Sequence, residues 1–204
     1  MKKDTRLALR NVVGPLTDLH HKLASSQGER WLTGLKLFLR EGPRVESSFP
    51  VWMEARLCNL SGQNMIDLLR FHHLDVSEEA KSLMLSPEFA TKPEDSSFEL
   101  VRASLVEIGV TSKLPGLAEI FRCAKYCGLE LCHPRIGPSV ILEAAHKLEG
   151  EEIYVGMKQV KTEDFPKGLN FNLFERGIDA FDSGLGCEGC WDRESVWLWV
   201  KRKF

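Results

Sequence analysis

The chain has 204 residues, of which 43% are apolar and 27% are charged, and its formal net charge is −2 at pH 7. This is the composition of a soluble globular protein that is long enough for one larger domain or two small ones. The charge balance gives no reason to expect binding to nucleic acid or to an anionic membrane, and no apolar run resembles a signal peptide or a membrane span. We therefore expect a cytoplasmic protein.

Two amphipathic helices are predicted near the N-terminus. The first begins near Pro15, where proline suits a first helical turn, and it ends at the polar run from Ser25 to Gly28. The second has apolar residues from Trp31 to Leu39 at helical spacing and is stopped by Gly42-Pro43. Together they indicate a helical hairpin whose apolar faces need to be buried.

The middle of the chain predicts two more helices. One covers Met65 to His72 and is started by Ser61, and the next begins at Ser77, whose side chain suits a helix cap, and ends before Pro87. The segment from Val51 to Leu60 fits either a short strand or an edge segment. Because residues 91–97 are polar and include a proline, we place a boundary there, with a helical region over residues 1–95.

The remaining residues, 96–204, predict a sheet with one helix. The helix covers Pro115 to Cys127 and ends at Gly128, which can adopt the left-handed conformation that closes a helix. The expected strands lie within residues 98–108 and at 129–132, 140–145, 153–160, 169–174 and 195–201. Their short polar connections favour mostly antiparallel pairing, so we predict an α+β fold in which the helical region packs on this sheet. The two regions could equally be one continuous globular unit.

The order of these motifs resembles a group of uncharacterised bacterial proteins. They share an early Trp-Leu-x-x-Leu-Lys-x-Phe-Leu-Arg helix, here Trp31–Arg40, and a Gly-Leu-x-Leu-Cys-x-x-x-x-Gly-Pro signature, here running from Gly128 to Pro138. Between and after them come Glu107-Ile108-Gly109 and Ile153–Met157 in the same order, so the likeness spans most of the chain. It implies a shared fold, but no activity and no site residues, because no activity is known for the group. Cys123 and the segment from Cys187 to Cys190 depart from its pattern.

Six cysteines raise the question of a metal. Without a secretory signal, reduced thiols or a metal site are more plausible than disulfides. Two thiolates separated by two residues, such as Cys187 and Cys190, can provide half of a zinc site, and Cys132 and His133 could complete it. The competing interpretation is that these are ordinary free cysteines, which are often buried, and that no cofactor is bound.

The last strand is apolar on both of its faces. Trp197 and Trp199 share one face, while Val196, Leu198 and Val200 share the other, so both faces need to be covered. Coverage by the protein's own helices and turns is the simpler interpretation. The alternative is an exposed aromatic patch for a partner protein, a ligand or a second copy of the chain, formed by Trp197, Trp199, Trp191 and Phe174.

The sequence contains no motif that identifies a reaction. No nucleophile is paired with a recognisable base, and the glycines form no phosphate-binding pattern. The leading hypothesis is therefore a non-catalytic cytoplasmic binding or interaction protein of unknown partner. The alternatives are a zinc-stapled structural domain and an unrecognised small hydrolase or transferase.

Overall fold

A computed structural model describes residues 14–32, 35, 47–91, 97–148, 150–182 and 191–202. The chain divides into two compact units, Met1–Arg44 and Val45–Phe204. The boundary predicted near residue 95 is therefore not where the structure divides. The helices between residues 62 and 90 belong to the same unit as the sheet that follows them.

The first unit contains the predicted N-terminal helices, as far as its residues are described. Residues 14–23 and 28–32 are helical, with a turn between them at the predicted polar run, and much of the helix predicted over Trp31–Leu39 lies outside the described residues. Lys22 pairs with Asp18 at 2.8 Å, and its amine lies 4.5 Å from the centre of the Trp31 ring. No described side chain of this unit is buried, so the unit has no core among these residues.

The second unit contains both strands and helices, and among its described residues β5 to β8 follow one another without a helix between them. Its strands are β1 Met53–Arg56, β2 Asp75–Val76, β3 Ser97–Ser104, β4 Leu129–Glu130, β5 Ile153–Val155, β6 Leu169–Phe174, β7 Gly177–Asp182 and β8 Val196–Lys201. Its helices are α3 Gly62–Phe71, α4 Glu78–Met84, α5 Pro87–Ala90, α6 Leu117–Tyr126 and α7 Ile136–Ala144, followed by the 3-10 turn η1 Ala145–Lys147.

Helix ends follow the local chemistry of the sequence. The Ser61 and Ser77 hydroxyls accept hydrogen bonds from the backbone N–H groups of Asn64 and Ala80, so both predicted caps are confirmed. Ser86 caps α5 in the same way. After α6, Gly128 has φ +71°, the left-handed conformation predicted for it.

The strands form one mixed sheet in the order β1-β3-β8-β5-β6-β7-β2, and β4 also pairs with β8. The pairs β5–β8 and β2–β7 are parallel, and the other strand pairs are antiparallel. The α+β fold is therefore confirmed. Most pairs are antiparallel, as predicted, but only β6 and β7 are joined by a short turn, and the other antiparallel pairs join strands that are further apart in the sequence.

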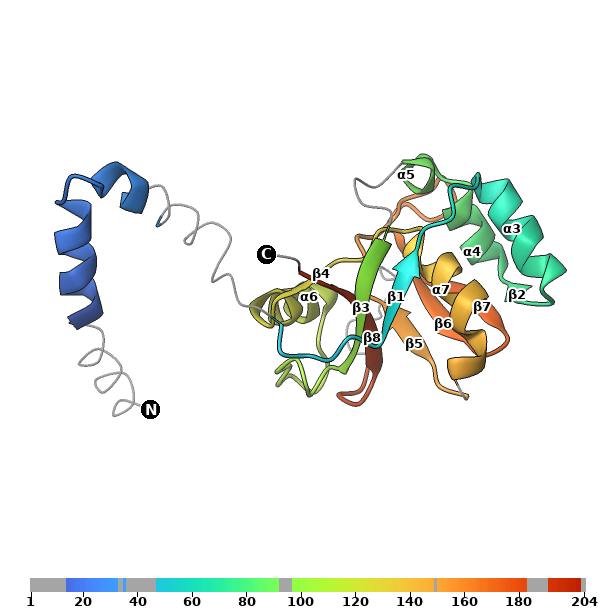
Figure 1. Cartoon of the computed structure of the whole chain (residues 1–204). Helices are drawn as coiled ribbons and strands as arrows, with labels where there is room; N and C mark the ends of the chain where they lie inside the picture. Colours follow the sequence, from blue (N-terminus) through green and yellow to red (C-terminus); the bar gives the residue numbers. More distant parts are fainter. Residues whose placement is uncertain are drawn as a thin grey trace. The chain divides into compact units, whose positions relative to one another are not determined.

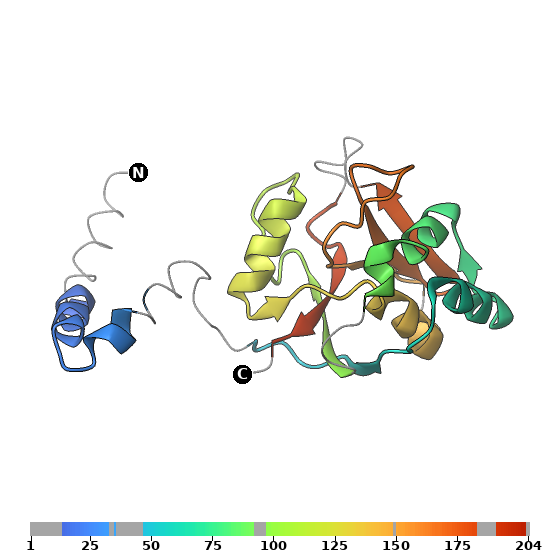
Figure 2. The same ribbon diagram turned by 90° about the horizontal axis from the view of Figure 1, so that it is seen from above.

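Helices cover the sheet on both faces (Figures 1 and 2). One hydrophobic cluster joins α3, α4 and α7 to one face of the sheet and includes Leu198 and Val200 of β8. The other joins α6 to the opposite face and includes Trp197 and Trp199. The two-sided apolar pattern of β8 is thus explained, because each of its faces lies under its own layer of helix.

The strand predicted at residues 140–145 is wrong, because residues 140–144 lie in α7 and residue 145 begins η1. Seven of the nine residues of α7 are buried, so the helix shows no polar face from which a helical period could be recognised. The C-terminal region accordingly contains α7 as well as the single helix predicted there, α6. Strand β7, which pairs along the whole length of β6, was not predicted.

Candidate ligand-binding site

The three tryptophans proposed for an exposed patch are buried. Trp197 and Trp199 have 0% relative exposure and Trp191 has 3%. Trp197 stacks on Trp199 and on Tyr154, with ring centres 5.8 and 5.4 Å apart, and Trp191 meets Trp197 edge-on. The exposed-patch hypothesis is therefore wrong for these residues, because α6 and neighbouring aromatic rings cover them. Phe174 is half-buried at the end of β6, opposite Gly177.

The residues proposed for zinc are only partly described. Cys187 and Cys190 lie outside the described residues, and Cys132 and His133 point into different surroundings. The Cys132 thiol is buried in the core and lies 3.4 Å from the Leu198 carbonyl oxygen, and burial raises its pKa far above the ordinary thiol range. Across the part of the chain that the structure describes, no three His, Cys, Asp or Glu side chains are placed to hold one metal ion.

A pocket of about 720 Å³ opens beside His133, and we refer to it as the His133 pocket. Three parts of the sequence form it: the end of α5 with the nearby start of β3, residues 131–134, and residues 158–161. Its volume lies within the range of small-molecule sites, about 300–1,000 Å³. The lining residues are Glu88, Thr91, Phe98, Leu131, Cys132, His133, Pro134, Lys158, Gln159, Val160 and Lys161.

The buried Arg135 side chain holds the α5 side of this pocket in place. Its guanidinium donates to the carbonyl oxygen of Phe89 at 2.9 Å, that of Ala90 at 3.4 Å and that of Leu60 at 2.9 Å. These bonds tie the last turn of α5 and the segment before α3 to the start of α7. Because the carbonyls at the end of a short helix lack partners within the helix, a buried arginine can stabilise them strongly.

The opposite wall, residues 158–161, is held by strand pairing and by a buried amide. Val160 and Leu169 exchange two backbone hydrogen bonds, of 3.0 and 2.8 Å. The Asn170 side chain, which has 0% exposure, donates to the Met157 carbonyl oxygen at 2.8 Å. Both ends of this wall are therefore anchored to β6, and the pocket is pre-formed.

Both nitrogens of His133 are engaged by the protein itself. The backbone N–H of Arg135 donates to Nδ1 at 3.2 Å, so Nδ1 is an acceptor and carries no proton. Thr91 Oγ1 donates its proton to the Glu88 carbonyl oxygen at 2.6 Å, which leaves it to accept from Nε2–H of His133 at 3.2 Å. Burial, together with the nearby Arg135 charge, lowers the pKa of His133, in agreement with a neutral ring.

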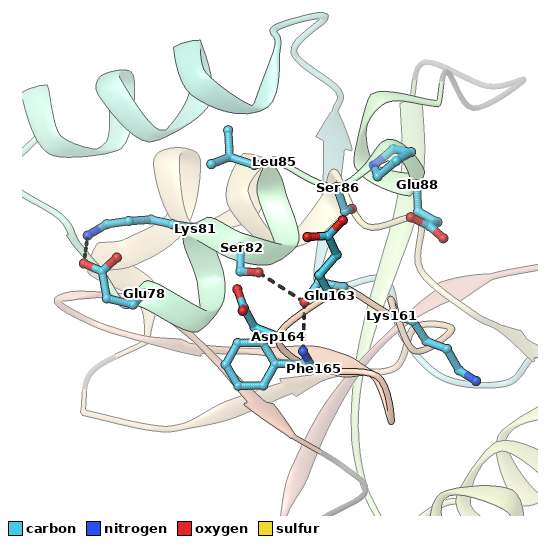
Figure 3. Close-up of a pocket in the computed structure, with 12 residues that line it drawn as sticks. Glu78, Lys81, Ser82, Leu85, Ser86, Glu88, Lys161, Glu163, Asp164 and Phe165 are labelled. Atoms are coloured by element: carbon cyan, nitrogen blue, oxygen red, sulfur yellow. Dashed lines mark hydrogen bonds and ion pairs between the residues drawn. The ribbon is translucent and has the colours of Figure 1, made fainter.

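A second, more open hollow of about 1,000 Å³ adjoins the His133 pocket and shares Glu88 and Lys161 with it. It lies between α4, α5 and residues 161–165, as Figure 3 shows. The Ser82 hydroxyl bonds to that of Thr162 at 3.2 Å, which links α4 to this loop. Its side chains include Glu163 and Asp164, so acidic groups line this hollow, while Lys81 is paired with Glu78.

Neither Cys132 nor His133 is in a state that suits nucleophilic or general-base chemistry. A nucleophilic cysteine needs a lowered pKa, whereas the pKa of Cys132 is raised, and a general base needs a free lone pair, whereas Nδ1 of His133 is occupied. Sequence reasoning singled out Cys132 and His133. It did not identify Thr91, Arg135, Lys158 and Lys161 as residues of a site, because no local motif joins them. Only the fold brings them together.

Comparisons with protein-family models, with curated proteins and with solved structures found no match for this chain. Among the described residues, no helix is both long and apolar enough to cross a membrane.

Proposed function

We propose that this protein is a non-catalytic cytoplasmic binding protein whose ligand occupies the His133 pocket. The observation that carries this proposal is the hydrogen-bond pattern of His133 at the wall of a pre-formed, ligand-sized pocket. A ring whose two nitrogens are already satisfied can shape and orient a ligand, but it cannot readily exchange protons with one.

The surface of the pocket supports the same conclusion. Leu131 keeps 42% of its surface exposed at the pocket wall, and Phe98 is only partly buried. An apolar wall with a few polar groups at fixed positions is the usual composition of a small-molecule site. A ligand that covers Leu131 would remove apolar surface from water, which contributes roughly 25 cal/mol per Å².

A reducing compartment is supported by the thiols. The four described cysteines, Cys58, Cys123, Cys127 and Cys132, are all free. Free thiols are typical of cytoplasmic proteins.

The test is a fragment screen by two-dimensional NMR on the full-length ¹⁵N-labelled protein. We expect hits whose shift changes cluster on residues 131–134 and 158–161, and each ligand should be recovered unchanged after overnight incubation. Leu131→Trp fills the pocket and should abolish these shifts. Leu114→Trp makes the same substitution at a side chain that is 69% exposed and does not line the pocket, and it should preserve them.

Two results would overturn the proposal. One is a set of hits that map away from the pocket and respond equally to both tryptophan variants. The other is chemical conversion of a bound fragment that stops in Leu131→Trp, because this would make the pocket an active site.

A further inference from the structure

We infer that the ligand of the His133 pocket is an organic anion with an apolar body, its acidic group placed between Lys158 and Lys161. This inference rests on the proposed function, since it assumes that the pocket binds a ligand. It adds the chemical class of that ligand and the residues that select it.

The two lysines carry positive charge that the protein leaves unpaired. Some described cations are paired with carboxylates, namely Lys81 with Glu78, Arg102 with Glu151 and Arg202 with Glu130, while others, such as Lys125 on α6, are not paired within the described part of the chain. For Lys158 and Lys161 as well, no carboxylate among the described residues lies within ion-pair distance. Both side chains are exposed and both line the pocket. They are three residues apart on a wall anchored to β6, so their backbone is already fixed before a ligand arrives.

The apolar part of the pocket adjoins this charge. Val160, which lies between the lysines in sequence, is buried, while Leu131 and Phe98 contribute apolar surface to the same pocket. A hydrophilic anion such as inorganic phosphate would leave this apolar wall in contact with water. A neutral apolar ligand would leave the two ammonium groups without a counterion. A ligand with an acidic group and an apolar body would pair with the lysines and cover the apolar wall.

The surrounding charges favour an anion over a cation. Among the described residues that line the pocket, Glu88 is the one acidic side chain, against two lysines, and His133 contributes a neutral ring. The acidic residues Glu163 and Asp164 line the adjoining hollow instead, and Figure 3 shows the Lys161 side chain directed away from Asp164. A cationic ligand would therefore find better partners in that hollow than in the His133 pocket.

The test is isothermal titration calorimetry with two ligands that differ in charge alone, 1-naphthaleneacetate and 1-naphthaleneacetamide. A third titration uses decanoate, a carboxylate with an aliphatic chain. It shows whether the pocket prefers an aromatic or an aliphatic apolar body on the anion. We expect the full-length protein to bind the acetate about tenfold more tightly than the amide at 50 mM NaCl, because two nearby ammonium groups attract the carboxylate. Raising NaCl to 500 mM should reduce this preference.

The charge-reversed variant Lys158→Glu/Lys161→Glu should lose about tenfold or more in affinity for the acetate and little for the amide. Lys125→Glu, at an exposed lysine of α6 outside the pocket, is the matched control and should bind both ligands as the unmodified protein does. Circular dichroism checks that the variants are folded.

Equal binding of acetate and amide, both blocked by Leu131→Trp, would overturn the inference about charge and leave the proposed binding function standing. Binding of the acetate that Lys158→Glu/Lys161→Glu does not weaken would also overturn it. A third contradicting result is that neither naphthyl ligand nor decanoate binds while NMR fragments still occupy the pocket. The pocket would then bind a ligand of another chemical class, and the proposed binding function would still stand.

Discussion

His133 occupies a position where protonation would break a hydrogen bond. A proton on Nδ1 would face the backbone N–H of Arg135 at 3.2 Å, and the Arg135 side chain adds a positive charge nearby. The folded protein therefore disfavours the charged ring, and the unfolded chain takes up this proton at a higher pH. The contribution of His133 to the free energy of unfolding is therefore present above pH 6.5, and it is lost as the pH falls through the lowered pKa of His133 in the folded protein.

The variant His133→Asn tests this pH dependence. Its side-chain oxygen can still accept from the Arg135 N–H, but it cannot be protonated. Urea unfolding at pH 7.5 and pH 5.5 should show a smaller loss of the free energy of unfolding on acidification than in the unmodified protein. The control variant His146→Asn changes an exposed residue of η1, and its free energy of unfolding should fall on acidification by as much as that of the unmodified protein. An equal loss in all three proteins would contradict the role given to His133.

At the scale of single residues, the sequence singled out Cys132 and His133 as possible zinc ligands but did not predict their surroundings. Cys132 and His133 are neighbours, which suggested a shared metal. Both residues line the pocket, but Cys132 is buried in the core with its thiol near the Leu198 carbonyl oxygen, while the His133 ring is engaged by Thr91 and by the Arg135 N–H. The partner of His133, Thr91, is 42 positions away and could not be found from local spacing.

At the scale of helices and strands, an element could be predicted where its sequence has a clear hydrophobic period and a recognisable end. Helix α6 has one buried face, a glycine stop and a clear period, and it was predicted within two residues at its start and one at its end. Helix α7 is buried almost all round, so its apolar run could not be distinguished from a buried strand. Strand β7 contains polar and charged residues, and its pairing with β6 comes from the turn at residues 175–176, which the sequence alone did not single out.

Gly156, just after β5, is required for close packing of the sheet against Trp199. A Cβ atom built at this position would lie 2.3 Å from the Trp199 ring, which is fully buried and cannot move aside easily. We expect Gly156→Ala to reduce the free energy of unfolding by about 2 kcal/mol, measured by urea denaturation. Gly116→Ala, where a Cβ would meet no atom within 4 Å, is the matched control and should cost about 0.5 kcal/mol. Equal losses would show that the ring can shift.

On the scale of the whole molecule, the described core lies in the second unit. The buried residues of both hydrophobic clusters come from residues 53–200, and no described residue of Met1–Arg44 is buried. A fragment starting at Val45 should therefore fold with a thermal midpoint within about 3 °C of the full-length protein, as measured by circular dichroism. A fragment that is unfolded, or that melts more than about 10 °C lower, would show that the first unit contributes to the core.

The sequence predicted the α+β fold and the two-sided burial of β8, because both follow from hydrophobic periodicity. It could not predict the site, because the His133 pocket is formed by segments that are brought together only by the sheet order and by the carbonyl contacts of Arg135. The division between the units was also missed. The helices of residues 62–90 pack on the sheet, as predicted for the helical region, but they form one unit with it, because their buried residues share its core.

The central claim is that the His133 pocket holds an organic anion without reacting with it, and a crystal structure of the full-length protein with 1-naphthaleneacetate tests it most directly. The account predicts intact ligand in the pocket, its naphthyl ring against Leu131 and Phe98 and its carboxylate within ion-pair distance of Lys158 or Lys161. Ligand bound only elsewhere, or bound here with its carboxylate turned away from both lysines, would contradict it.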